Sequence, residues 1–448
     1  MLYYGVLKYL NSVVYNMCIK LILLSLFLSG ICVFASSCSK NQKNDGELLF
    51  WSSNNLPEIE FAQDMIETWN ASNSPHINFQ PVPEGQSSEE MILAAVVAKT
   101  TPDIYANMRQ GDVEFYAESH VLIPLDTLDG FLEFMYARCD SSVMDEIRSA
   151  DGHTYQVPWK INPIIVLYNQ DYYDELGVVD YPRTYSAYLS LAEKFKKDMD
   201  GDGYVDRWFG NTESNVLWYQ RFFNFIPLYY AASGGSPLIE NNKAAFNNEA
   251  AVKVFTFLQT LYKNQYFPIE RLAARRDPFL YGDIATKWTG PWDVPFIQKF
   301  KPDLNFNAHP MPVPDDYIGV SHTYADPKSI VIFKYSSNPQ KAWDFLQQFL
   351  SIENDFKFFS LSKQFPRRKD LLTDSIFVNY LKRNPQLAPF AKQAKYTHGI
   401  SDTPYMKEIL ALISQEYEAC VVYGKKEPRQ AIQDAAQAVD LLYLNLSQ

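Results

Sequence analysis

Cysteine and histidine are scarce in this chain of 448 residues, which holds five cysteines and six histidines. Beyond Cys38 only Cys139 and Cys420 remain, too few for a disulfide framework, although one bridge between them stays possible. No paired-cysteine spacing, glycine-rich phosphate loop or serine-nucleophile turn occurs. The sequence therefore predicts a fold held by its core. It also favours binding over catalysis, although two carboxylates distant in the chain could still cleave glycosides.

Basic residues are also in deficit, with 40 lysines and arginines against 52 aspartates and glutamates and a formal net charge of −12. Because nucleic acid and anionic lipid both attract basic proteins, this balance argues against nucleic acid as a partner and against adsorption to anionic lipid. Aromatic residues are plentiful instead, at 15%. Rings fill protein cores, and they are also the flat surfaces on which sugar rings stack. The chain is long enough for two domains with separate cores.

The N-terminal region carries the features of an export signal. An apolar run follows Lys20 and ends in small residues directly before Cys38, where a bacterial lipoprotein would be cleaved and acylated. We therefore expect a signal peptide over 1–37, a lipid on Cys38 and a flexible tether over 38–45. This arrangement would place the protein in the periplasm or at the cell surface, moored to a bacterial membrane. An uncleaved anchor helix is the alternative, although its apolar run is shorter than the roughly 20 residues that a span prefers.

Strand-like and helix-like segments alternate along the first part of the remaining chain. This order is typical of crossover units, in which a mainly parallel sheet carries helices on both faces. Helical patterns dominate the second part, where one helix is indicated by an asparagine cap followed by proline. The expected strands are 47–51, 77–82 and 102–106, and the expected helices are 56–70, 87–98, 249–262, one beginning at Asn338-Pro339 and one after Pro428.

One acidic segment reproduces most of a calcium-binding loop. Oxygen-bearing side chains alternate along it, with a glycine at the sixth position and a backbone carbonyl at the seventh. The twelfth position, where a glutamate should close the shell, is Phe209. A weakened structural calcium site is one interpretation, and an acidic surface turn without metal is the other. No other cofactor is required. The expected ligands are Asp198, Asp200, Asp202, Tyr204 and Asp206.

Aromatic residues stand at positions suited to a ligand cleft. Trp51 ends the first strand, and ligands of open parallel sheets lie beyond the carboxyl ends of strands. Around Gly290 a Gly-Pro turn is flanked by two tryptophans and a carboxylate, a costly arrangement for a purely structural role. Each of these residues could alternatively serve packing alone. The candidates chosen on these chemical grounds are Trp51, Trp159, Trp218, Tyr219, Trp292 and Asp293.

Eight further segments follow one another in a familiar order. They are Thr101-Pro-Asp-Ile-Tyr, Asp151-Gly-His-Thr-Tyr-Gln-Val-Pro-Trp, Val166-Leu-Tyr-Asn, Tyr181-Pro-Arg-Thr-Tyr, Thr289-Gly-Pro-Trp, Asn338-Pro-Gln-Lys-Ala-Trp, Phe365-Pro-Arg-Arg and Gly424-Lys-Lys-Glu-Pro. Together they resemble the extracellular solute-binding proteins of ATP-binding-cassette importers, in the sugar-binding group that includes maltose-binding protein. The resemblance spans nearly the whole chain beyond the tether.

The resemblance implies an α/β fold of the type II periplasmic-binding-protein class. Two lobes, each a mainly parallel sheet flanked by helices, would enclose a ligand cleft at the hinge. The implied N-terminal lobe is 46–157 with 290–335, and the implied C-terminal lobe is 158–289 with 336–448. The ligand contacts implied by the likeness are Trp51, Ser52, Asp103, Gly290, Trp292 and Arg368.

We therefore expect a monomeric receptor that binds a sugar or oligosaccharide, catalyses no reaction and delivers its ligand to the membrane permease of an ATP-binding-cassette importer. A different solute is an alternative, either a sugar phosphate, a polyamine or a peptide. Arg109, Arg367 and Arg368 would suit an anionic ligand. A surface enzyme acting on glycans, and an adhesin or sensor that has lost solute binding, are the remaining alternatives.

Overall fold

The computed structural model describes residues 46–82, 86–212, 217–269, 272, 276–400 and 403–446. The predicted signal peptide, the lipid on Cys38 and the tether over 38–45 lie outside these ranges. From Leu48 onwards the chain forms one compact unit. Within the described ranges, no helix combines the length and the apolar character needed to cross a membrane.

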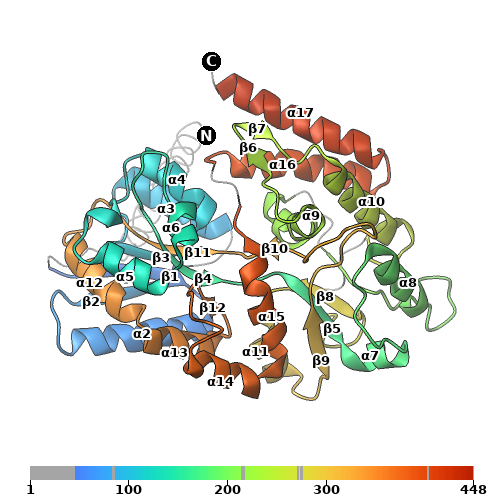
Figure 1. Cartoon of the computed structure of the whole chain (residues 1–448), viewed down its shortest axis with the longest axis horizontal. Helices are drawn as coiled ribbons and strands as arrows, with labels where there is room; N and C mark the ends of the chain where they lie inside the picture. Colours follow the sequence, from blue (N-terminus) through green and yellow to red (C-terminus); the bar gives the residue numbers. More distant parts are fainter. Residues whose placement is uncertain are drawn as a thin grey trace, which may run out of the picture. The chain divides into compact units, whose positions relative to one another are not determined.

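The first sheet has six strands in the order β12-β4-β11-β3-β1-β2 (Figure 1). Strand β1 pairs in parallel with β2 and β3, so that Phe50 lies opposite both Phe79 and Ile104. Strand β11 pairs antiparallel with β3 and β4, and β12 pairs antiparallel with β4. The strands are β1 (Leu48–Ser53), β2 (Ile77–Val82), β3 (Ile104–Arg109), β4 (Val157–Ile161), β11 (Lys328–Ile332) and β12 (Phe365–Pro366).

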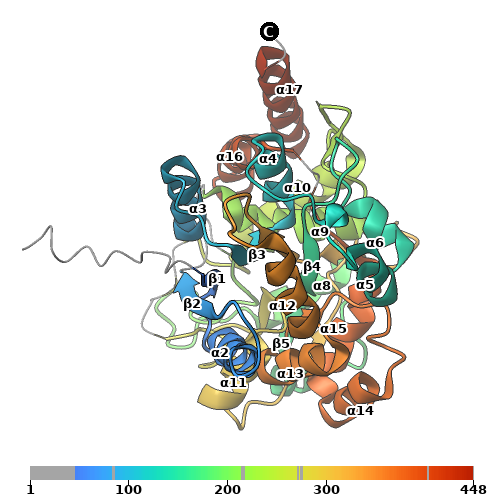
Figure 2. The ribbon, with the colours of Figure 1, turned by 90° about the vertical axis from the view of Figure 1, so that its left-hand side faces the viewer.

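Helices cover both faces of this sheet (Figures 1 and 2). Leu48 and Phe50 point to the face that packs on α2, α12 and α13, while Trp51 points to the face that packs on α3 and α4, as alternation along a strand requires. The predicted asparagine cap is confirmed, because Asn338 accepts a hydrogen bond from the backbone N–H of Lys341. The helices around this sheet are α2 (Leu56–Asn70), α3 (Gln86–Ala98), α4 (Gln110–Glu118), α5 (Phe131–Arg138), α6 (Ser141–Glu146), α12 (Pro339–Phe349) and α13 (Ile352–Ser362).

The second sheet is small and wholly antiparallel. Its order is β8-β5-β9, and Val166 of β5 lies opposite Trp288 on one side and His309 on the other. The prediction of a mainly parallel sheet in each lobe is therefore wrong. In the first sheet the parallel pairs are those among β1, β2 and β3, which alternate with helices along the chain, whereas β4, β11 and β12 return from later segments and pair antiparallel. The three strands are β5 (Ile165–Asn169), β8 (Thr286–Thr289) and β9 (Phe306–His309).

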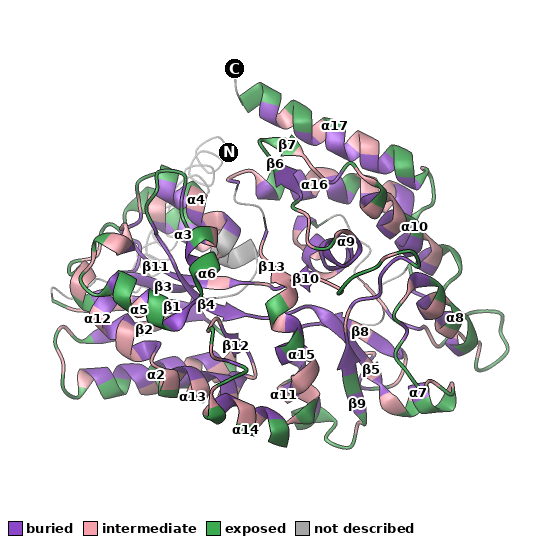
Figure 3. Ribbon diagram, in the orientation of Figure 1, coloured by how far each residue is buried: buried purple, intermediate pink, exposed green. Residues whose placement is uncertain are grey.

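A second core surrounds α9, in which every residue from Phe225 to Ala232 is buried. A helix that is apolar all round needs cover on all sides, and α10, α16 and α17 supply it with their inner faces (Figure 3). The helices of this core are α7 (Gln170–Glu175), α8 (Tyr185–Phe195), α9 (Phe225–Ser233), α10 (Glu249–Lys263), α16 (Met406–Tyr417) and α17 (Pro428–Leu446). A third cluster joins β5 and β9 to α11 (Asp293–Phe300), α14 (Ser375–Arg383) and α15 (Ala388–Gln393). The short elements include the 3₁₀ helix η2 (Trp218–Phe223) and the strands β6 (Ile239–Glu240), β7 (Lys243–Ala244), β10 (Thr323–Tyr324) and β13 (Thr397–His398).

The packing of α12 and α13 departs from the predicted lobes. Both helices fall within 336–448, which was assigned to the C-terminal lobe, yet Trp343 and Phe358 join the cluster of Phe50 on the first sheet. The order of helices along a chain does not reveal which sheet their apolar faces will cover, and this is why the assignment of these two helices failed. The other lobe boundaries stay a prediction. Cys139 and Cys420 are buried free thiols in different clusters, so they form no bridge.

Candidate functional site

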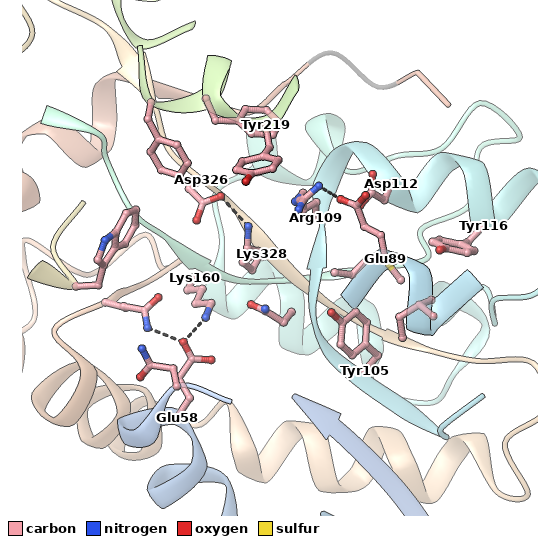
Figure 4. A pocket seen from close by; sticks show the side chains of 18 residues that line it. Glu58, Glu89, Tyr105, Arg109, Asp112, Tyr116, Lys160, Tyr219, Asp326 and Lys328 are labelled. Atoms are coloured by element: carbon pink, nitrogen blue, oxygen red, sulfur yellow. Dashed lines mark hydrogen bonds and ion pairs between the residues drawn. The ribbon is translucent and has the colours of Figure 1, made fainter. Parts of the chain in front are cut away.

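A cavity of about 440 Å³, called here the first cavity, lies where the carboxyl ends of β1 and β3 approach η2 and the turn before α11. Eighteen residues line it (Figure 4). The ends of β1 and β3 meet at one edge because the two strands are parallel, and ligands of open α/β sheets bind at such an edge. The volume falls within the range of about 300–1,000 Å³ that is usual for small-molecule sites.

A buried ion pair forms one wall of the first cavity. The Lys160 ammonium nitrogen lies 2.5 Å from Oε1 of Glu58, and both side chains are at most 2% exposed. The amide of Gln364 donates to the same oxygen at 2.6 Å. The other carboxylate oxygen of Glu58 is buried and has no hydrogen-bond partner within the described part of the chain. Glu58 therefore offers the cavity an acceptor whose orientation is fixed by its two partners.

Two more ion pairs lie along the same wall, one between Asp326 and Lys328 at 2.7 Å and one between Arg109 and Glu89. Burial alone would raise the pKa of Asp326, but the charges of Lys328 and Arg109 hold it below its ordinary value, so the carboxylate is ionised at neutral pH. Asp326 also has a φ of +37°, in the left-handed region. Backbone strain of this kind persists where the surrounding structure enforces it, and it is concentrated at functional sites.

Unpaired acceptors are a second feature of this wall. Asn55 and Asn107 line the first cavity, and the side-chain oxygen of each is buried without a hydrogen-bond partner among the described residues. Leaving a buried acceptor unpaired costs about 1–3 kcal/mol. A ligand that brings hydroxyl donors would remove this cost, so the wall is suited to a polyhydroxylated molecule.

Aromatic rings form another wall. Tyr219, Phe222 and Phe223 come from η2, and Trp292 comes from the turn before α11. The rings of Phe223 and Trp292 meet edge to face, with centroids 6.4 Å apart. A Cβ on Gly290 would lie 2.2 Å from the Trp292 ring, so only glycine lets the indole fold back over its own turn. The sequence thus builds a rigid apolar surface beside the polar wall.

Some of the predicted site residues meet in this region. Tyr219 and Trp292 line the first cavity, and Gly290 supports Trp292. Asp293 follows Trp292, but its carboxylate is paired with Lys287 at 2.8 Å. Trp218 lies against Arg109 and lines a neighbouring cavity.

Five other predicted residues are not brought to the first cavity. Trp51 is buried in the cluster on the α3 side of the sheet, and the hydroxyl of Ser52 donates to the carbonyl of Ala106 at 2.8 Å. The carboxylate of Asp103 accepts backbone N–H groups of Leu49, at 2.7 Å, and Ser337, at 3.0 Å. These contacts hold the ends of the strands together.

Trp159 and Arg368 also serve the interior. Trp159 is 1% exposed and packs on Phe358 with ring centroids 4.8 Å apart. Arg368 pairs with Asp355 and Asp370, in a cluster that shares Asp355 with the buried Arg138. Both side chains are therefore engaged with partners inside the protein.

Sequence reasoning missed most of the polar wall. Glu58 and Asn55 follow the first strand at its carboxyl end, which was a usable signal, and Lys160 stands beside the predicted Trp159. Asp326 and Lys328 belong to no motif. Their role depends on a strand that inserts between β3 and β4 from far along the chain.

The calcium-like loop has part of the expected geometry. Carboxylate oxygens of Asp198, Asp200 and Asp206 lie within 4.8 Å of one another, all on exposed side chains. Backbone N–H groups of Gly203 and Gly201 donate to Asp198 and hold its pKa below its ordinary value. Asp202 accepts the backbone N–H of Tyr204, and the Tyr204 side chain is exposed. Phe209, at the twelfth position, is fully buried in the second core, so it leaves that position without a ligand.

Comparison with known proteins gives consistent matches. A family described as bacterial extracellular solute-binding protein matches residues 64–389. The arabinooligosaccharide-binding protein of Bacillus subtilis is 24% identical over 260 residues, which are 55% of this chain and 54% of that protein. An uncharacterized protein from Listeria monocytogenes has a TM-score of 0.76 at 27% identity, covering 89% of this chain and 100% of that one. The cyclic alpha-maltosyl-1,6-maltose binding protein from Arthrobacter globiformis has a TM-score of 0.73 at 20% identity, covering 89% and 99%.

These matches confirm the predicted two-lobed α/β fold of type II periplasmic binding proteins. The matched family and the structural neighbours with assigned roles are binding proteins and not enzymes, in line with the lack of a catalytic motif in the sequence.

Proposed function

The chain belongs to the bacterial extracellular solute-binding protein family, and from that premise we propose that it binds a neutral sugar or oligosaccharide in the first cavity. Membership implies a binding protein that works outside the cytoplasm, and it leaves the ligand open. The observation that carries the proposal is the pairing of two unlike walls, with unpaired buried acceptors on one side and aromatic rings on the other.

Each wall suits one part of a sugar. The C–H faces of a pyranose stack on flat rings such as Trp292 and Tyr219. Its hydroxyls donate to fixed oxygens such as those of Glu58 and Asn107, which gives orientation and specificity. Relatives of the chain are named as binding proteins for arabinooligosaccharides, diacetylchitobiose and cyclic alpha-maltosyl-1,6-maltose, all of them carbohydrates.

The charges of the cavity disfavour the other solutes. Its three cations, Arg109, Lys160 and Lys328, are each paired with a carboxylate, so a sugar phosphate would find no cation that is not already engaged. Arg367 and Arg368, which also suggested an anionic ligand, do not line this cavity. A polyamine would need several unpaired carboxylates, and three of the four that line the cavity are already in ion pairs.

Asp112 is the fourth carboxylate in the cavity. Burial raises its pKa above the ordinary value against the opposing charges of Arg109, Lys328 and Lys407. A single carboxylate of this kind is too little to bind a polyamine, so a neutral polyhydroxylated molecule is the better fit.

Titration calorimetry and thermal shift test the proposal with malto-, arabino- and N-acetylated chito-oligosaccharides, beside spermidine and glucose 6-phosphate. We expect saturable binding of at least one neutral class, with a melting temperature that rises with sugar concentration. Binding of only the amine or the phosphate would reject the neutral-sugar assignment. Recovery of the sugar intact after prolonged incubation is the matching check that no turnover occurs.

We further propose that a lipid on Cys38 moors the protein as a monomer beside the permease of an ATP-binding-cassette importer, which receives the sugar. The support is the apolar run with its Ser-Ser-Cys end in the sequence, together with the family membership. Mass spectrometry of protein extracted from membranes should find an acylated Cys38, and Cys38→Ser should move the protein out of the membrane fraction. An unmodified Cys38 in membrane-bound protein would remove the lipid anchor from the proposal.

Calcium binding by the loop at 198–206 is a separate proposal. Its support is the proximity of the carboxylates of Asp198, Asp200 and Asp206. A calcium titration should give saturable heat that Asp200→Asn weakens, with exposed Asp180→Asn as the control. No heat in the wild-type protein would assign the loop to an acidic surface turn.

A further inference from the structure

A second cavity of about 250 Å³ adjoins the first. The two cavities have five lining residues in common, which therefore form a shared wall. The shared residues are Glu89, Arg109, Asp112, Tyr116 and Phe222. The space for a ligand thus continues past these side chains, towards α16 and the segment before it.

Arg109 is the cation of the shared wall. Its guanidinium carbon lies 5.0 Å from the centroid of the Trp218 ring and 5.9 Å from that of Phe222. The guanidinium is also paired with Glu89 (Figure 4). The guanidinium therefore covers one face of Trp218, on which a flat ligand would otherwise stack. Since an arginine side chain has several rotatable bonds, it can leave that face while its charge stays near Glu89.

Trp218 has the properties of an unused anchor. It is 8% exposed and lines the second cavity, and its indole N–H has no hydrogen-bond partner in the described structure. Buried indole N–H groups are usually paired, so this one is free to donate to a ligand oxygen. Phe222 beside it is fixed by stacking on Tyr324, with centroids 4.9 Å apart and planes 13° apart.

On the basis of the proposed function, we infer that the second cavity is an additional sugar subsite, entered past Arg109, and that the full ligand is an oligosaccharide occupying both cavities. In the bound state Arg109 leaves the face of Trp218, a sugar ring stacks there, and the indole N–H donates to that ring. A short sugar fills the first cavity alone and leaves Arg109 on Trp218. Arg109 and Trp218 thereby determine the preferred chain length.

The charge of the second cavity supports a neutral occupant. Four carboxylates line it against two cations, so an anionic chain end would be repelled. The lining also includes apolar side chains such as Leu93, Phe115 and Met406, which suit the C–H surfaces of a sugar.

The test compares the affinity for sugars of increasing length between the wild type and a variant whose second cavity is filled. Leu93 lies on α3, is 46% exposed and lines only the second cavity, so Leu93→Trp should fill that cavity without disturbing the fold. Val97 lies one helical turn further, is 77% exposed and lines neither cavity, so Val97→Trp is the matched control. Affinities are measured by calorimetry for malto-, arabino- and N-acetylated chito-oligosaccharides from the disaccharide to the hexasaccharide.

In the wild type we expect affinity to rise by about tenfold at the length that outgrows the first cavity, the effect of one buried aromatic anchor. Leu93→Trp should abolish this rise and leave the shorter sugars unchanged, while Val97→Trp should match the wild type. If Leu93→Trp lowers the melting temperature of the protein, Glu408→Trp is used in its place, because Glu408 also lines the second cavity.

The outcomes separate the two proposals. Equal affinity for short and long sugars, or an equal loss for all lengths in Leu93→Trp, overturns the second subsite and leaves the first cavity as a sugar site. If no sugar of any length binds, the proposed function itself fails.

Discussion

The two walls of the first cavity are held in place by different forces. The polar wall consists of side chains from several segments fixed by ion pairs, which are buried for Glu58 with Lys160 and partly buried for Asp326 with Lys328. The aromatic wall consists of neighbouring residues of η2 and of Trp292, fixed by ring packing and by the space that Gly290 leaves. The polar wall therefore determines where hydroxyls must lie, and the aromatic wall supplies contact area with little demand on direction.

Substitutions in the two walls should therefore differ in their effects on stability and on binding. Removing one partner of a buried ion pair leaves an uncompensated charge, so substitutions in the polar wall should lower stability and binding together. Trp292 is only partly buried, so its loss should affect mainly the ligand. Comparing stability with affinity for each variant is therefore the way to separate the two walls.

The largest effect is expected for Glu58→Ala, which leaves Lys160 buried without its carboxylate and Gln364 without its acceptor. The free energy of unfolding should fall by about 3–5 kcal/mol, measured by urea denaturation. Glu60→Ala, at an exposed position on the same helix, is the control and should change it by less than about 0.5 kcal/mol. A loss below about 1 kcal/mol in Glu58→Ala would show that the polar wall is not held by this pair.

Trp292→Ala should weaken sugar binding by about 2 kcal/mol, because it removes the main stacking surface of the aromatic wall. Calorimetry measures the affinity, and thermal unfolding should show a much smaller change. Phe296→Ala, one turn into α11 and outside the cavity lining, is the matched control. Unchanged affinity in a folded Trp292→Ala protein would exclude this ring from the site.

Gly290→Ala tests the same wall without removing the ring. The added methyl would lie 2.2 Å from the indole, so Trp292 must shift away from the cavity. We expect a loss of about 1 kcal/mol in binding, smaller than for Trp292→Ala because the ring is displaced and not deleted. A protein carrying both Gly290→Ala and Trp292→Ala should bind sugar no worse than Trp292→Ala alone. If the losses of binding free energy add instead, Gly290 does not act through Trp292.

The smallest effect concerns pH. The folded-state pKa of Asp326 lies below its ordinary value of 3.8, so its ionised form stabilises the fold at neutral pH, and this contribution is lost as pH falls through the folded-state pKa. Asp326→Asn keeps a residue tolerant of positive φ and removes the titration. Between about pH 5 and pH 3 the wild type should lose more stability than the variant in urea denaturation. If the free energy of unfolding falls equally with pH in the wild type and in Asp326→Asn, titration of Asp326 does not contribute to the loss of stability in acid.

The two walls also differ in how far the sequence revealed them. Trp292 and Tyr219 were predicted because aromatic residues beside a Gly-Pro turn or a basic residue are visible within a few positions. The polar wall was missed because its partners are remote, with Glu58 separated from Lys160 by 102 positions and from Gln364 by 306. Periodicity reveals helices and motifs reveal a family, but neither reveals which distant charges will pair.

The fold was likewise predicted where the signal is local in the sequence and missed where it depends on distant segments. The helices at 56–70 and 249–262 were predicted from their apolar faces, and the resemblance to solute-binding proteins is confirmed by the family match. Strand direction beyond β3 was predicted wrongly, since it depends on how β4, β11 and β12 return to the sheet. Trp159 and Arg368 were predicted to face a ligand, but their partners Phe358 and Asp355 are interior residues.

The most direct test of sugar binding between the two walls is a crystal structure of the protein with the tightest-binding neutral oligosaccharide. We predict a sugar ring stacked on Trp292 or Tyr219, with hydroxyls donating to Glu58 and Asn107. Sugar density that contacts neither wall, or that lies only beside Arg368, would contradict it.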